Sequence, residues 1–242
     1  MSHECTQERF LRDVAEHTMI VIRDDGVNRH IRFKKPDSGC MHFDLITWPG
    51  YLCYTGDMGT YVFQRTTDMF AFFRKNGRLD CIDHNYWAEK IEAADRDGVR
   101  KFSHAKFQAM VRSWVDDSEE SDKPDDDDVA ALAKHRAAYA ELREAVNDEV
   151  VNADDNSTRC YDAANDFRHN GDAWEEFYGK DAQFEFTDVW DGFDFATKEY
   201  TFRFVWCCYA LAWGIEQYDA AKRAAAEGAL VASDTELAGA PP

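Results

Sequence analysis

Several features that define common classes of protein are missing from this chain of 242 residues. No run of residues reaches the ~18 apolar positions that a membrane-spanning helix needs. The nearest candidate, residues 204–215, is too short and directly follows Arg203. The sequence begins MSHECTQERF, which is polar and charged and unlike a secretory signal peptide. We therefore expect a soluble, cytoplasmic protein that does not enter a membrane.

The cysteine pattern excludes two further classes. The chain has seven cysteines, an odd number, and no two of them have the CxxC spacing. This pattern argues against a disulfide framework or a zinc knuckle and predicts reduced, mostly buried thiols. Cys81 and His84 have a metal-like spacing, but a structural zinc site needs four ligands and no second pair lies nearby in the sequence. We expect no metal and no cofactor.

The motifs of several large enzyme families are absent. We find no P-loop, dinucleotide-binding fingerprint, nucleophile elbow or HExxH sequence, and no internal repeat. Whether the protein is an enzyme stays open, and a protein without catalytic residues is the favoured interpretation. The alternative is a small enzyme acting on nucleotides or nucleic acid, with a histidine beside carboxylates as general base. Its site would lie near the N-terminal sheet and use His42, Asp44, Asp57, Arg65 and His84.

The densest apolar and aromatic segment, residues 40–73, indicates the fold of the N-terminal part. Apolar and polar residues alternate from Met41 to Trp48, which predicts a strand with one face on a core and places His42 and Asp44 on one face. Pro49-Gly50 and the glycine-rich turn at 56–59 interrupt this pattern and predict tight turns. With two earlier strands, we expect an antiparallel meander of about five strands with packed helices. The basic strand within it is expected to be exposed or near an edge, where Arg29, Arg32, Lys34 and Lys35 could touch phosphates.

The rest of the sequence has helical periodicity. One helix is predicted over residues 83–95 and the longest over 197–227, while residues 183–195 fit an edge strand or an irregular loop. The fold class is therefore α+β: an N-terminal antiparallel meander followed by a mainly helical, acidic part. The expected parts are an α+β domain (1–115), an acidic linker or loop (116–128), a helical acidic region (129–228) and a flexible tail (229–242).

The distribution of charge separates the two halves of the chain. Residues 1–110 contain 16 Lys+Arg and 16 Asp+Glu, whereas residues 111–242 contain 12 Lys+Arg and 31 Asp+Glu. The net charge of −19 therefore lies in the C-terminal half. Such a surface repels phosphates and attracts basic partners, so we expect no direct binding of nucleic acid by this half. The carboxylates predicted to form the binding surface are Asp116, Asp117, Glu119, Glu120, Asp122, Asp125, Asp126, Asp127, Asp128, Glu175 and Glu176.

The segment HFDLITWPGYLCYTGDMGTYVFQRTTDMFAFFR and the following NYWAEKIEAAD resemble a family of uncharacterised proteins encoded by phages, prophages and other mobile elements. The WPG turn, the GDMGTYVF hairpin and the YWAEK segment produce this similarity, which covers roughly residues 40–95. The family has no established activity. What the resemblance implies is a setting, namely an accessory protein of a mobile element in a bacterial cytoplasm.

Charge and setting together favour one hypothesis over two others. In the favoured hypothesis, the protein is an inhibitor that binds a basic, nucleic-acid-binding host protein, such as a defence component, through an acidic surface that mimics DNA. The small enzyme described above is the alternative. In a third interpretation the acidity serves only solubility. The sequence does not predict the oligomeric state.

Overall fold

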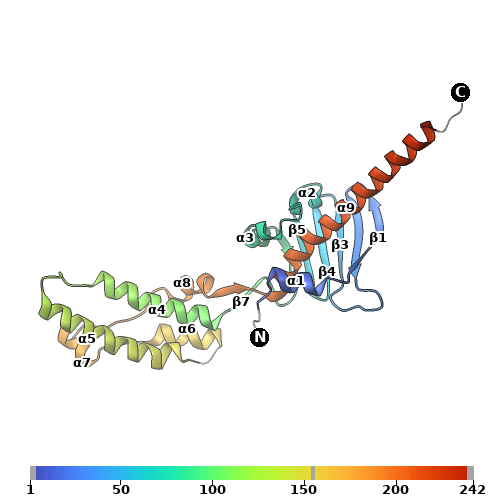
Figure 1. Ribbon diagram of the computed structural model, residues 1–242. Coiled ribbons are helices and arrows are strands. Elements are labelled where there is room, and N and C mark those ends of the chain that lie inside the picture. Colours follow the sequence, from blue (N-terminus) through green and yellow to red (C-terminus); the bar gives the residue numbers. More distant parts are fainter. Residues whose placement is uncertain (1–3, 154–155, 239–242) are drawn as a thin grey trace. The chain divides into compact units, whose positions relative to one another are not determined.

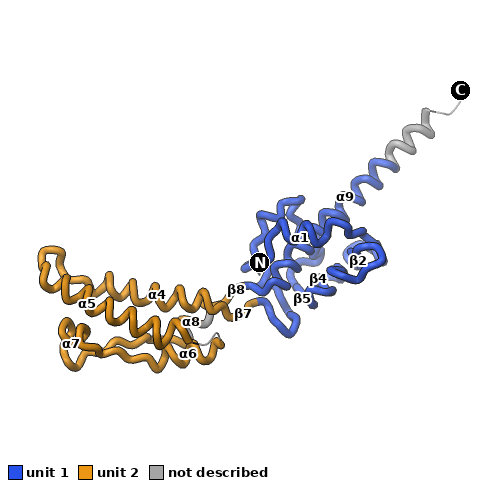
Figure 2. Tube along the Cα trace, turned by 60° about the horizontal axis from the view of Figure 1, so that its bottom comes forward, with its two compact units in different colours: residues 1–99, 200–242 blue, residues 100–199 orange. Residues whose placement is uncertain are grey.

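The computed structural model describes residues 4–153 and 156–238. Two compact units form, one from residues 1–99 and 200–242 and the other from residues 100–199 (Figures 1 and 2). We call them the sheet unit and the helical unit. The helical unit is an insertion in the sequence of the sheet unit, because the chain leaves the sheet unit after its last strand and returns to it as the final helix.

This division differs from the expected boundaries in two places. Residues 100–115 belong to the helical unit, and the final helix, α9 (Phe202–Ala238), belongs to the sheet unit. The expected tail, 229–242, overlaps α9, and residues 239–242 lie outside the described residues. A local pattern identifies a long apolar helix but does not identify its partner, which here is a sheet more than a hundred residues earlier in the chain.

The main sheet is an antiparallel meander, which confirms the predicted α+β class. It has six strands, one more than expected, in the order β1-β2-β3-β4-β5-β6. Consecutive strands are neighbours because their connections are mostly short turns, and Gly26 and Gly59 take positive φ at two of them. The strands are β1 (Thr18–Asp25), β2 (Asn28–Lys34), β3 (Phe43–Trp48), β4 (Tyr51–Gly56), β5 (Gly59–Gln64) and β6 (Ile91–Ala93).

The extra strand replaces part of a predicted helix. Residues 83–95 form only a short helix, α3 (His84–Ala88), with Asp83 as its N-cap, and then β6. In β6, Ile91 pairs with Phe63 of β5. Pairing with an otherwise unpaired strand has overridden local helix propensity, which is a weak determinant.

Helix α9 covers one face of the sheet and forms its core (Figure 1). Trp206 meets Phe43 of β3 with ring centroids 5.6 Å apart, and Trp213 meets Phe33 of β2 at 5.3 Å. Gly214 lets the helix approach closely, since a Cβ there would lie 3.0 Å from the ring of Phe33. The smaller helices of this unit are α1 (Gln7–Asp13), α2 (Met69–Phe73) and η1 (Leu79–Cys81).

The helical unit has its own core of aromatic and aliphatic side chains, among them Phe107, Tyr139 and Trp174. Two long helices, α4 (His104–Ser121) and α5 (Val129–Val146), pack against shorter ones. A two-stranded sheet lies where the chain enters and leaves the unit. The other elements are β7 (Arg100–Phe102), η2 (Asn147–Val151), α6 (Ser157–Asp166), α7 (Asp172–Tyr178), α8 (Val189–Ala196) and β8 (Lys198–Tyr200).

Two predictions for this region were wrong in their details. The expected linker 116–128 is helical as far as Ser121, because Val111 and Val115 hold α4 on the core while the acidic side chains lie mostly on its outer face. Only the segment after it is a loop. The segment 183–195, expected as an edge strand or loop, contains one isolated bridge and then α8. Among the described residues, no helix has the length and apolarity to cross a membrane.

Candidate protein-binding surface

The predicted acidic residues come together at one end of the helical unit. They lie on the last turns of α4, on the loop from α4 to α5, and on α7. Figure 1 shows α7 beside α5 at the end where this loop turns. Two contacts join the elements: Tyr178 of α7 bonds to Asp122, and Glu176 of α7 pairs with Lys134 of α5 at 3.2 Å. We call this surface, residues 116–128 with Glu175 and Glu176, the acidic end.

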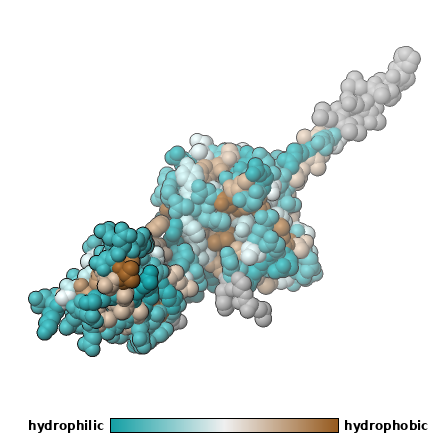
Figure 3. Space-filling view, turned by 60° about the vertical axis from the view of Figure 1, so that its left-hand side comes forward, coloured by the Kyte–Doolittle hydropathy of each residue, from teal (hydrophilic) through white to brown (hydrophobic). Residues whose placement is uncertain are grey.

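The charge of the unit is far from balanced. The helical unit contains 26 Asp+Glu and 12 Lys+Arg, a net charge of −14, whereas the sheet unit contains 21 and 16, a net charge of −5. Within residues 116–128, nine carboxylates face one lysine. On the face shown in Figure 3, hydrophilic residues cover most of the helical unit. The segregation of charge predicted along the sequence is therefore also a segregation between folded units.

Some of these carboxylates are neutralised within the unit. Arg143 of α5 donates to Asp116 at 2.8 Å and also to Glu119, and Lys123 lies 2.9 Å from Asp126. Both carboxylates raise the pKa of the Arg143 guanidinium, with Glu119 the larger influence. The two pairs with Arg143 offset the unfavourable position of Asp116 and Glu119 near the C-terminus of α4. Five exposed carboxylates form no ion pair with any residue that the structure describes: Asp117, Glu120, Asp125, Asp127 and Asp128.

A second group holds the acidic end in place. The hydroxyls of Tyr139 and Tyr178 both donate to Oδ2 of Asp122, at 3.1 and 2.9 Å. On α7, two backbone N–H groups at the helix start, those of Ala173 and Trp174, donate to Glu141 Oε2 of α5 at 3.0 and 3.2 Å. A carboxylate there satisfies helix donors and opposes the positive end of the helix dipole. Sequence reasoning missed these residues, because their partners are distant in the chain.

A groove runs along α4 into the acidic end. It encloses about 420 Å³. Its apolar part is formed by Met110 and Trp114, and its far end by Asp117 and Asp122. Three hydroxyls complete the lining, those of Ser113, Ser118 and Ser121. Such a groove suits a lysine or arginine side chain, whose apolar stem and charged head need different surroundings.

The residues of the alternative enzyme site do not form one cluster. His42 Nδ1 lies 3.1 Å from Asp57 Oδ1, and both side chains are partly exposed. Asp44 instead accepts hydrogen bonds from Arg32 and His30, each at 2.8 Å. The expected shared strand face of His42 and Asp44 is not observed, because His42 precedes β3.

The other two residues of that site lie elsewhere. Arg65 is exposed at the end of β5, where its backbone N–H bonds to Gly50. His84, on α3, packs against the rings of Tyr200 and Tyr209, and burial lowers its pKa. Within residues 4–153 and 156–238, no three His, Cys, Asp or Glu side chains are grouped as metal ligands.

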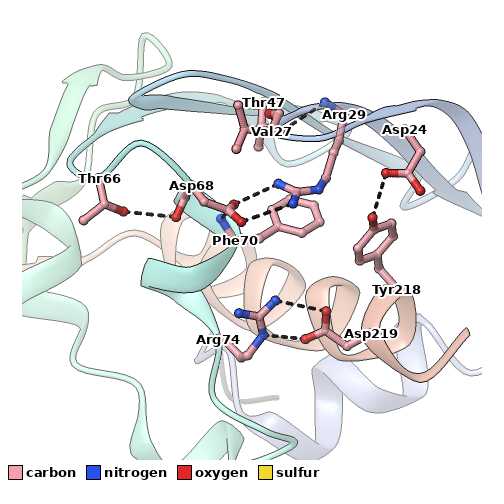
Figure 4. Close-up of polar contacts among 10 residues, drawn as sticks. All are labelled: Asp24, Val27, Arg29, Thr47, Thr66, Asp68, Phe70, Arg74, Tyr218 and Asp219. Carbon is pink, nitrogen blue, oxygen red and sulfur yellow. Dashed lines mark hydrogen bonds and ion pairs between the residues drawn. The ribbon is translucent and has the colours of Figure 1, made fainter. Parts of the chain in front are cut away.

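The basic strand is β2, the second strand of the sheet and not an edge. Arg29 donates to both oxygens of Asp68, at 2.8 and 3.1 Å, and lies over the ring of Phe70 (Figure 4). Only 10% of its side chain is exposed. Nearby, Arg74 bonds both oxygens of Asp219 on α9 (Figure 4). Arg29 therefore holds α2 against the sheet and is not available to phosphates.

Two further basic residues of this segment also have acidic partners. Arg32 bonds to Asp44, and Lys35 lies 2.6 Å from Glu16. Contact with phosphates would have to compete with these ion pairs.

Comparison of the chain with protein-family models, with curated proteins and with solved structures gives no match. The functional argument therefore depends on the surface itself.

Proposed function

We propose that this protein binds and inhibits a basic, nucleic-acid-binding host protein by placing the acidic end in the groove that nucleic acid would occupy. In this proposal it is an accessory protein of a phage or mobile element, acts in the bacterial cytoplasm against a defence component, and catalyses no reaction. The gathering of acids from α4, the following loop and α7 at one end of a folded unit is the observation that supports it most strongly.

Three physical features favour such a partner. A net charge of −14 on a unit of one hundred residues produces a field that attracts cationic grooves and repels phosphates. The bonds to Asp122 and the pairing of Arg143 fix the positions of several carboxylates, so less conformational entropy is lost on binding. The groove along α4 adds a place for one basic side chain beside Trp114.

The test uses two matched variants of the full chain. One removes three exposed charges of the acidic end, by Glu120→Gln, Asp125→Asn and Asp127→Asn; Asp128 is kept because it caps α5 through the N–H of Ala131. The control removes three exposed charges of the sheet unit, by Asp37→Asn, Asp80→Asn and Glu92→Gln. Both variants change the net charge by the same amount.

Immobilised protein is incubated with bacterial lysate at low and high salt, and bound proteins are identified by mass spectrometry. We expect basic, nucleic-acid-binding proteins that elute with salt, that duplex DNA displaces, and that the acidic-end variant loses while the control retains them. Partners that DNA does not displace, or equal losses in both variants, would contradict the proposal. If both variants behave like the unmodified chain, the acidity serves solubility alone.

A further inference from the structure

The first strand of the main sheet is an edge strand with an exposed apolar stretch. β1 pairs with β2 on one side, and no other described strand pairs with its second side. Three consecutive aliphatic residues on it are exposed: Ile20 by 42%, Val21 by 48% and Ile22 by 50%. The strand contains neither proline nor lysine, which usually protect such edges. Its protective features, a β-bulge between Val21 and Arg23 and the charged residues 23–25, lie at one end and leave residues 18–21 regular.

The opposite edge of the sheet differs. β6 has only three residues, Ile91 to Ala93, and its centre is Glu92. Short, charged edges discourage pairing with another chain. The sheet therefore has one edge suited to accept a further strand, and that edge is β1.

We propose that β1 pairs with β1 of a second copy of this chain, around a two-fold axis through Ile20, so that the two sheets join into one of twelve strands. Antiparallel pairing about Ile20 sets Ile20 opposite its own copy and Met19 opposite Val21, within the regular part of the strand that precedes the bulge at Ile22. Each of these apolar side chains thus meets another apolar side chain. The charged residues that follow, Arg23 to Asp25, stay outside the paired segment.

Helix α9 supplies a second reason for adding strands at this edge. It crosses the sheet from Tyr61 of β5, which Phe204 contacts, to Asp24 of β1, to which Tyr218 donates at 2.7 Å. Lys222 also reaches Asp24, at 2.7 Å, and the helix then continues past β1 with residues 223–228 exposed (Figure 1). At 1.5 Å per residue these six residues extend about 9 Å, close to two strand spacings of ~4.8 Å. Strands added beside β1 would lie below this overhang.

A second copy fits this edge because the exposed apolar stretch is complementary to itself in antiparallel pairing. The sheet unit, which carries the pairing edge, contributes only −5 to the chain's net charge of −19. Isologous pairing also removes the exposed edge from both copies at once, and such two-fold dimers are the commonest oligomers. This dimer is independent of the acidic end, so either proposal can fail alone.

Sedimentation velocity over a range of protein concentrations tests the pairing. We expect a species of twice the 27.9 kDa of one chain. Ile20→Lys would place two lysines opposite each other at the axis and should yield a monomer. Thr60→Lys, an exposed position on the inner strand β5, should leave the dimer intact. A monomer at every concentration, or a dimer that Ile20→Lys does not change, overturns the proposal.

Cross-linking tests the register without relying on a charged residue. In a chain whose exposed cysteines are replaced, by Cys40→Ser and Cys81→Ser, the variant Ile20→Cys should form a disulfide-linked dimer under mild oxidation. Asp25→Cys, outside the paired segment, should not. Absence of the cross-link at position 20, or equal cross-linking at both positions, overturns the two-fold through Ile20.

Discussion

Tyr178, at the end of α7, donates a 2.9 Å hydrogen bond to Asp122, the residue that follows α4. Tyr139 of α5 donates to the same oxygen at 3.1 Å. Burial raises the pKa of Tyr139 to about 12, so its phenol remains a donor at neutral pH. One carboxylate thus joins three helices at the point where the acidic loop begins.

The first prediction concerns this junction. Tyr178→Phe removes one bond to Asp122, and we expect the free energy of unfolding of the helical unit to fall by about 1 kcal/mol. Hydrogen exchange followed by mass spectrometry should show faster exchange in residues 122–128. Tyr86→Phe, which removes a phenol hydroxyl from an exposed side chain of the sheet unit, is the control and should change neither quantity. Unchanged exchange in the loop would show that Tyr139 alone positions Asp122.

The second prediction concerns the start of α7. Glu141→Ala removes the carboxylate that accepts the N–H groups of Ala173 and Trp174, and losing such a cap costs about 1 kcal/mol. We expect earlier urea unfolding of the helical unit and faster amide exchange in α7. Glu144→Ala, an exposed position on the same helix, is the control and should have little effect. Equal destabilisation by both variants would contradict the capping role.

Local sequence patterns predicted much of the sheet, but they did not predict which elements pair with it or pack on it. Alternation from Met41 to Trp48 predicted a strand, and β3 covers Phe43 to Trp48, because period-two burial is visible in one segment. The strand β6 was missed, since Ile91 is extended only through its pairing with Phe63. The domain boundaries differed for the same reason: the sequence does not reveal that α9 packs on strands from the start of the chain.

The candidate site shows the same limit. The carboxylates were identified from composition alone, and their gathering around Asp122 depends on bonds from Tyr139 and Tyr178, which no spacing predicts. The groove could have been found from the sequence. Met110 and Trp114 are four residues apart and lie on one face of α4, but the acidic run was interpreted as a linker, whereas α4 continues into it as far as Ser121.

The third prediction concerns the stability of the sheet unit at low pH. Burial alone would raise the pKa of Asp44, but hydrogen bonds from Arg32 and His30 outweigh it and hold the pKa below its usual value. The pKa of Asp68 is also lowered, by Arg29 against the effect of burial. A lowered pKa in the folded state contributes stability above the unfolded-state value, about 3.9, which is lost as the pH falls through the lower folded value.

The free energy of unfolding of the sheet unit should therefore decrease as the pH falls below about 4. In Asp44→Asn this decrease should be smaller, because one of the carboxylates with a lowered pKa is gone, although the variant is less stable at pH 7. Urea unfolding monitored by tryptophan fluorescence at several pH values measures both effects. An identical pH dependence in Asp44→Asn and the unmodified chain would rule out a contribution from Asp44.

The fourth prediction concerns the contact between α9 and the sheet. A Cβ at position 214 would lie 3.0 Å from Phe33 and 3.1 Å from Leu45, so Gly214→Leu must push the helix away from the core. Overpacking of this kind costs about 1–3 kcal/mol, more than the ~1 kcal/mol that replacing glycine in a helix gains. Gly228→Leu is the matched control, because nothing lies within 4 Å of a Cβ at that exposed position of the same helix. We expect thermal unfolding of the sheet unit at a lower temperature for Gly214→Leu and at an unchanged or higher one for Gly228→Leu. If Gly214→Leu is as stable as the unmodified chain, α9 does not approach β2 and β3 as closely as described.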